Sequence, residues 1–135
     1  RGTGIAILSD GLDFYLDRMF ANLGLRTCGD DSCLRATDCL LRFSNAATFG
    51  PDGLRIEFPY CNACGQCGNC KVEHLFRLRR SATRVIYLGD GHSDLCAARF
   101  ADLIFAKHAL AEDCQSAGRP YIPFETFADV MRVLA

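Results

Sequence analysis

The stretch from Val85 to Asp94 constrains the fold of this chain more than any other. It opens with four apolar residues, 85–88, rich in β-branched and aromatic side chains, a pattern typical of a buried parallel strand. Gly89 ends the run, and Asp90 and Asp94 follow at the carboxyl end of the predicted strand. Ligands of open α/β sheets bind at that end, and two carboxylates there suit a hard cation such as Mg²⁺. Taken alone, the pair fits a helix cap and a turn equally well.

The composition excludes several classes of protein. The chain has 135 residues, enough for one domain, and its 50% hydrophobic and 23% charged residues predict a globular protein. A net charge of −1 gives no attraction to nucleic acid or to an anionic membrane, and no apolar run approaches the ~20 residues that span a bilayer. Without a signal peptide, the sequence predicts a cytoplasmic protein whose nine cysteines, an odd number, are mainly reduced. The abrupt start at Arg1 indicates a piece of something longer or a processed terminus.

The N-terminal segment predicts a strand, a tight turn and a helix. Residues 5–9 form a short apolar strand, Asp10-Gly11 marks a turn, and apolar residues recur at helical spacing from Leu12 until Gly24 stops the helix. Ser9 then lies at the carboxyl end of the strand, with the N–H groups of the helix just beyond it. That position suits an anion, although a simple capping role for this serine is an equal alternative.

The rest of the chain alternates strands and helices. A strand at 40–43, turns at 44–45 and 50–53, and a half-buried strand at 54–58 predict a small β-hairpin-like excursion. Strands that alternate with helices indicate parallel βαβ units and an α/β fold. The further expected elements are a helix opened by Lys71, a strand at 102–106, a helix at 109–117 and a terminal helix at 124–134.

Four cysteines repeat at three-residue steps just before Lys71. They are Cys61, Cys64, Cys67 and Cys70. Four thiolates can bind one Zn²⁺ ion, which would then fix the neighbouring lysine, although zinc sites usually separate the two pairs more widely. An iron–sulfur cluster, a reduced cysteine-rich loop and disulfides are the alternatives.

Three predicted strand-end sites carry complementary chemistry. A hydroxyl at Ser9 and an ammonium at Lys71 can hold phosphate oxygens. The carboxylates of Asp90 and Asp94 can hold a Mg²⁺ ion that neutralises the same group. This combination suits phosphoryl transfer, in which catalysis depends on positioning and charge stabilisation.

The order and spacing of these residues resemble motifs two, three and four of the haloacid dehalogenase (HAD) superfamily. Residues 7–14, 44–45, 70–71 and 102–107 make the resemblance closest to its phosphoserine-phosphatase-like branch, and especially to 2-hydroxy-3-keto-5-methylthiopentenyl-1-phosphate phosphatase-like proteins. The resemblance implies a three-layer Rossmann-like core with a parallel sheet, over residues 1–135, with a β-excursion and cysteine-rich loop at about 40–70.

The resemblance also implies an activity and roles for single residues. The activity is a magnesium-dependent phosphomonoesterase acting on a small phosphorylated metabolite through an aspartyl-phosphate. Ser9 would bind the phosphate, and Lys71 would bridge phosphate and nucleophile. Asp90 would ligate Mg²⁺, and Asp94 would support that ligation and orient Lys71. The expected neighbours of the substrate are Gly11, Gly91 and His92, although a solvent-facing loop is the alternative for the histidine.

One family motif is absent from the 135 residues. The Asp-x-Asp-Gly-Thr sequence would supply the nucleophile, the general acid/base and one Mg²⁺ ligand on a central strand, and the family's cap is absent as well. Without that strand, the strands of Ser9 and Asp90 either keep unpaired inner edges or are forced together. We therefore expect a marginal fold, inactive alone and catalytic only when joined to the missing segment. The alternatives are a split phosphatase, completed by a partner chain, and a non-catalytic zinc-binding interaction module.

Overall fold

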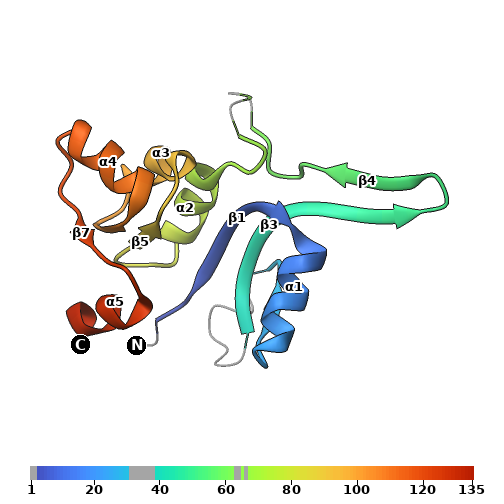
Figure 1. Cartoon of the computed structure of the whole chain (residues 1–135), viewed down its shortest axis with the longest axis horizontal. Helices are drawn as coiled ribbons and strands as arrows, with labels where there is room; N and C mark the ends of the chain where they lie inside the picture. The colour runs from blue at the N-terminus through green and yellow to red at the C-terminus, as the bar shows by residue number, and fades with distance from the viewer. Residues whose placement is uncertain (1–2, 31–38, 63–64, 66) are drawn as a thin grey trace. The chain divides into compact units, whose positions relative to one another are not determined.

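The computed structural model describes residues 3–30, 39–62, 65 and 67–135 (Figure 1). The chain is a mixed α/β protein with parallel strands, consistent with a Rossmann-like HAD core. It separates into an N-terminal unit, Arg1–Cys70, and a C-terminal unit, Lys71–Ala135. No helix within the described residues is both long and apolar enough to cross a membrane.

The N-terminal unit is built on a parallel sheet with the strand order β1-β3-β2. Leu41 and Phe43 of the central strand are fully buried, and Leu16 of the helix is nearly so, which explains why this helix folds onto the sheet. The helix ends as predicted at Gly24, whose φ of 72° is a conformation that glycine adopts without strain. The bounds are β1 Ala6–Leu12, α1 Asp13–Asn22, β2 Arg26–Cys28 and β3 Cys39–Gly50.

Two predicted turns of this unit are wrong. Asp10 and Gly11 lie inside β1, which continues to Leu12 and passes directly into α1. The pairing of β1 with β3 shifts its register between Leu8 and Leu12. The residues that predicted a turn therefore form an irregularity within the strand. Residues 44–45 likewise lie inside β3, where Asn45 pairs with Leu12 of β1, so the chain does not reverse there.

The predicted hairpin exists, but its second strand is not half-buried. β4 (Gly53–Glu57) pairs antiparallel with β3, and every one of its residues is exposed. The alternation of apolar and charged residues did indicate a strand. It could not indicate whether another layer covers the apolar face.

The C-terminal unit contains a second parallel sheet, with the order β5-β6-β7. Phe105, Phe124 and Val130 form its buried core, against which Ile86 and Leu88 pack. The expected strand and helices are confirmed to within a few residues. The bounds are α2 Lys71–Arg79, β5 Ile86–Gly89, the short η2 His92–Asp94, α3 Leu95–Ala98, β6 Leu103–Ala106, α4 His108–Ser116, β7 Ile122–Pro123 and α5 Phe127–Leu134.

The strand before each predicted site lies at the edge of its own sheet. Within the described residues, β1 pairs only with β3, and β5 pairs only with β6. Among the residues that the structure describes, the strands of Ser9 and Asp90 do not pair with each other, and each has one edge that pairs with no described strand. Such edges present open backbone N–H and C=O groups to any extended segment that can pair with them.

His74, in the first turns of α2, is expected to make the stability of the C-terminal unit depend on pH. Its side chain is buried, and burial together with the charge of Arg77 lowers the pKa of His74 from 6.5 to about 4. Between these values the unfolded chain binds a proton that the folded chain does not, so the free energy of unfolding should fall as the pH falls from 6.5 to 4. Denaturant unfolding at several pH values measures this fall, and an equally steep fall in His74→Gln would contradict the assignment.

Candidate functional site

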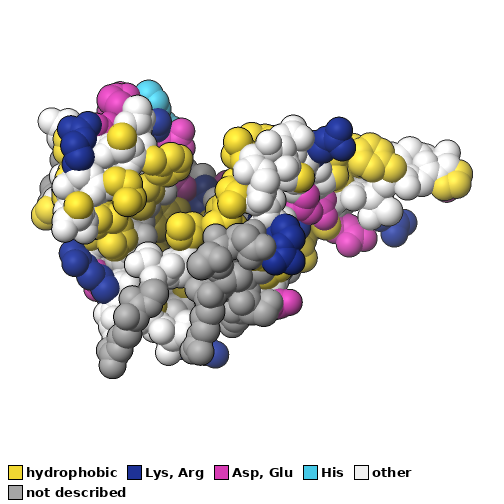
Figure 2. Space-filling view, turned by 90° about the horizontal axis from the view of Figure 1, so that it is seen from below, with side chains coloured by type: hydrophobic (Ala, Val, Ile, Leu, Met, Phe, Trp, Pro, Cys, Tyr) yellow, Lys and Arg dark blue, Asp and Glu magenta, His cyan; other side chains and the backbone are white. Residues whose placement is uncertain are grey.

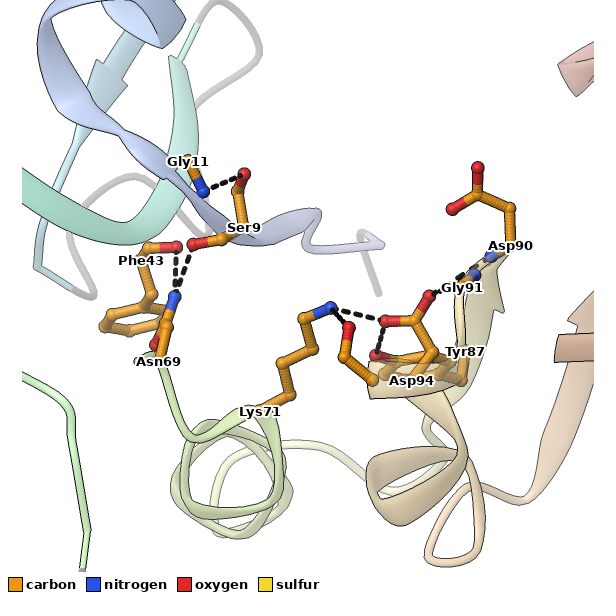
Figure 3. A network of polar contacts seen from close by, with 10 residues as sticks. Ser9, Gly11, Phe43, Asn69, Lys71, Tyr87, Asp90, Gly91 and Asp94 are labelled. Carbon is orange, nitrogen blue, oxygen red and sulfur yellow. Dashed lines mark hydrogen bonds and ion pairs between the residues drawn. The ribbon is translucent and has the colours of Figure 1, made fainter. Parts of the chain in front are cut away.

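Lys71 and Asp94 form a buried ion pair in the C-terminal unit (Figure 3). The Lys71 Nζ donates to Asp94 Oδ1 at 2.6 Å and to Ser93 Oγ at 2.8 Å. Both charged side chains are only 10% exposed, so the lysine is held in one place by a partner that water does not screen. The structure thus brings together two residues that lie 23 positions apart in the sequence.

Asp94 is also fixed by the turn that surrounds it. Its Oδ1 accepts a hydrogen bond from the Tyr87 hydroxyl at 2.9 Å, and its Oδ2 accepts the N–H groups of Asp90 and Gly91 at 3.1 Å each. Burial alone would raise the pKa of Asp94, but the hydrogen bonds from Lys71, Gly91 and Tyr87, together with the lysine charge, lower this pKa below its usual value. The carboxylate is therefore ionised at neutral pH, with both oxygens engaged.

Asp90, unlike the buried Asp94, is exposed to solvent. It follows β5 directly, as predicted. Its carboxylate points away from Asp94 in Figure 3. The donor chemistry fits Mg²⁺ in part: Asp90 offers carboxylate oxygen, while the oxygens of Asp94 are occupied by protein donors. One carboxylate does not make an octahedral site, so the fit requires further oxygen ligands.

Gly89 makes the close approach of Asp94 to the strand end possible. A Cβ at this position would lie 2.7 Å from Asp94 Oδ2 and 2.8 Å from a methyl group of Leu110. A Cβ at Gly91 would meet nothing closer than 3.8 Å.

Gly89→Ala is therefore expected to lower the free energy of unfolding by about 1–3 kcal/mol, because Asp94 and Leu110 must move. Gly91→Ala is the matched control, and we expect a change within about 0.5 kcal/mol. Denaturant unfolding of both variants measures the difference. Equal stabilities would show that the carboxylate of Asp94 does not pack against the strand end.

The Ser9 half of the predicted site lies in the N-terminal unit. Ser9 Oγ accepts the N–H of Gly11 at 3.0 Å, within β1 and not beyond its end. Asn69 is buried, and its side-chain amide donates to the carbonyl oxygens of Ser9 at 2.7 Å and of Phe43 at 2.9 Å, so one side chain ties β1 to β3 (Figure 3). At the start of α1, the carboxylate of Asp13 accepts the N–H of Phe14 at 2.8 Å. An acid thus already occupies part of the helix start where the sequence predicted an anion.

Each unit fixes its own predicted site residues. The approach of Ser9 to Lys71 and Asp90, which belong to different units, stays a prediction.

His92 lies on the surface. Its side chain is 76% exposed, and its Nδ1 lies 2.7 Å from Asp113 Oδ2. The hydrogen bond and the negative charge of Asp113 raise the pKa of His92. This placement fits the alternative of a solvent-facing loop histidine, and a contact with substrate stays a prediction.

The cysteine run shows no metal site in the part of the chain that the structure describes. Cys61 and Cys70 are free thiols, and Cys70 Sγ accepts a hydrogen bond from Asn62 Nδ2 at 2.8 Å. No cluster of three or more metal-binding side chains occurs among the described residues. Cys64 lies outside those residues. The zinc interpretation therefore receives no support from the described residues.

The expectation of free thiols elsewhere is partly wrong. Cys28 and Cys39 are disulfide-bonded, whereas Cys96 and Cys114 are free.

Three contributors to these sites were missed from the sequence. Tyr87 belongs to the apolar run that predicts a strand, and Ser93 lies in the turn between Asp90 and Asp94. Asn69 is a polar residue inside the cysteine run. The Tyr87 hydroxyl donates to Asp94, and the Ser93 hydroxyl accepts from Lys71. The Asn69 amide donates to the backbone of β1. The available signal was a polar tip within an apolar strand, since a buried tyrosine hydroxyl usually requires a partner.

No protein-family model matches this chain, but curated phosphatases are similar to it. The chain is 31% identical over 134 residues to the 2-hydroxy-3-keto-5-methylthiopentenyl-1-phosphate phosphatase of Exiguobacterium sibiricum, covering 97% of this chain and 55% of that protein. It is also 31% identical over 137 residues to the protein of the same name from Geobacillus kaustophilus, covering 99% and 56%.

A third relative is the bifunctional enzyme MtnB/MtnX of Bacillus licheniformis, 29% identical over 137 residues that make up 99% of this chain and 29% of that enzyme. The chain is thus a relative of phosphatases. More narrowly, it is a homologue of the 2-hydroxy-3-keto-5-methylthiopentenyl-1-phosphate phosphatases over nearly its whole length, which confirms the resemblance seen in the sequence. It spans about half the length of these two relatives.

Proposed function

We propose that this chain supplies the phosphate-binding and magnesium-supporting part of a cytoplasmic phosphomonoesterase that acts on a small phosphorylated metabolite. The observation that carries the proposal is the buried contact of Lys71 Nζ with Asp94 Oδ1 at 2.6 Å. A lysine held in this way offers a fixed positive charge that does not need to reorganise when a phosphate binds. Two of these relatives are named as phosphatases of one phosphorylated metabolite, which supports the class of substrate.

The environment of each residue determines its proposed role in binding the phosphate or Mg²⁺. Lys71 neutralises charge on the phosphate, and Asp94 keeps it ionised and oriented. Ser9 Oγ accepts the Gly11 N–H, so its own hydroxyl proton is available to donate to a phosphate oxygen. Asp90 would hold the Mg²⁺ ion, which lowers the charge on the phosphate when bound.

The nucleophile must come from outside these 135 residues, since they contain no Asp-x-Asp-Gly-Thr sequence. The relatives are about twice as long, which favours a segment of the same polypeptide over a separate chain. The edge of β1 that pairs with no described strand offers a place for such a segment to pair.

A chimera tests this proposal. It joins the chain to the segment of the Exiguobacterium sibiricum phosphatase that the chain does not cover, and release of inorganic phosphate from small phosphate monoesters is measured with and without Mg²⁺. We expect Mg²⁺-dependent turnover by the chimera and none by the chain alone. A folded chimera without turnover, or turnover by the chain alone that Asp90→Asn removes, would overturn it.

A further inference from the structure

The arm formed by the end of β3 and by β4 is the largest feature that the proposed function does not use. β3 and β4 continue together beyond α1 in Figure 1. The arm carries exposed apolar side chains: Phe49 is 65% exposed, Leu54 50%, Ile56 43% and Phe58 55%. Figure 2 shows both hydrophobic and charged side chains on its surface. Within the described residues β4 pairs only with β3, so its other edge is open.

The register of the hairpin determines which backbone groups face the open edge. Gly50 pairs with Gly53 across a two-residue turn, and in such a hairpin the closing pair exchanges hydrogen bonds and every second pair does the same. The backbone groups of Arg55 and Glu57 therefore point to β3, whereas those of Leu54 and Ile56 point outward. Any strand that adds to this edge must pair with these outward-facing residues.

The charges on β4 select a second copy of the same strand. Arg55 lies opposite Thr48 and Glu57 lies opposite Ala46, so neither has a charged neighbour across the hairpin, and neither forms an ion pair with any described residue. In an antiparallel pair with a two-fold axis at Ile56, Arg55 of each copy faces Glu57 of the other.

A shift of the two-fold axis by one residue in either direction places like charges opposite each other. With the two-fold axis at Arg55, two arginines face each other, and with the axis at Glu57, two glutamates do. Like charges directly opposite each other destabilise a strand pair, whereas opposite charges stabilise it. The axis at Ile56 also keeps the hydrogen-bonding alternation, because residue 56 faces outward and pairs with itself. Leu54 then lies opposite Phe58, and Pro59, which lacks an N–H, ends the ladder.

We propose that β4 pairs antiparallel with β4 of a second copy of this chain, with the two-fold axis at Ile56, and that this makes the protein a homodimer. The ladder is short, so the dimer is expected to be reversible, with a dissociation constant on the order of ten micromolar. The pairing covers exposed apolar residues of β4 and removes an open strand edge.

Charge reversal tests the register. Sedimentation equilibrium of the 135-residue chain gives the dissociation constant. Arg55→Glu and Glu57→Arg should each weaken the dimer at least about tenfold, because both cross-strand pairs become repulsive. The double variant Arg55→Glu/Glu57→Arg restores both attractions and should return to within about threefold of the parent chain.

Mixing the two single variants distinguishes pairing through β4 from unspecific association through other strand edges. An equimolar mixture of the two single variants should dimerise like the parent, since every cross-strand pair is then attractive. Arg80→Glu reverses an exposed charge of the C-terminal unit and is the control, with no expected change. A parent chain that stays monomeric would overturn the proposal and leave the arm to a different partner. Single variants that dimerise like the parent, a mixture that does not associate, or a control that weakens the dimer equally would overturn it as well.

Discussion

Replacing Asp94 with alanine is expected to lower the free energy of unfolding of the C-terminal unit by about 3–5 kcal/mol, the cost of breaking a buried ion pair from one side. The substitution leaves the Lys71 ammonium without its carboxylate partner, and it removes the acceptor of the Tyr87 hydroxyl. It also leaves the N–H groups of Asp90 and Gly91 without an acceptor. Each donor left unsatisfied adds its own desolvation cost.

Denaturant unfolding followed by circular dichroism measures this loss. Glu112→Ala is a matched control in the same unit, because it removes an exposed carboxylate from α4 and should change stability by no more than about 0.5 kcal/mol. Asp94→Asn should lie between the two, since it keeps an oxygen acceptor but not the charge. If Asp94→Ala is as stable as the control, then the network around this carboxylate does not hold the unit together.

Replacing Lys71 with arginine is expected to lower the turnover of the chimera by about 10²–10³-fold, the usual effect of displacing one charge-stabilising donor. Arginine keeps the positive charge and so keeps an ion pair with Asp94 possible, but its planar guanidinium cannot occupy the place of a compact ammonium. The chimera should therefore remain folded while the rate falls. The rate of phosphate release and the unfolding midpoint are measured on the same preparation.

A second substitution tests what the positive charge of Lys71 contributes to the rate and to stability. Lys71→Met removes the ammonium and leaves Asp94 buried without it, so both the rate and the unfolding midpoint should fall. Arg80→Lys, at the exposed end of the same segment, should change neither. Unchanged turnover in Lys71→Arg and Lys71→Met would exclude this lysine from phosphate binding.

The parts of the fold that follow from local pattern could be predicted from the sequence. The apolar run before Gly89 predicted β5, and the helical spacing after Leu12 predicted α1 with its end at Gly24. Both signals depend on periodicity and on backbone freedom, which neighbours in the chain largely determine. The placement of Asp90 directly after β5 followed from the same run.

What the sequence could not give depends on contacts between distant segments. Nothing local shows that β1 continues through Asp10 and Gly11, because pairing with β3 decides it. The exposure of β4 depends on what covers it, and the alternation of its residues is the same in either case. Tyr87 reaches Asp94 only because the turn after β5 folds back over the strand end.

The rate of Mg²⁺-dependent phosphate release by the chimera, compared between parent and Asp90→Asn over a range of Mg²⁺ concentrations, tests the central claim most directly. Because Asp90 is exposed, its replacement should leave the fold intact. The proposed site predicts a loss of about 10–100-fold in apparent Mg²⁺ affinity or in rate. Asp52→Asn, the same change at the exposed turn of the hairpin, should have no effect. Equal rates and equal Mg²⁺ dependence in the parent and Asp90→Asn would contradict the account.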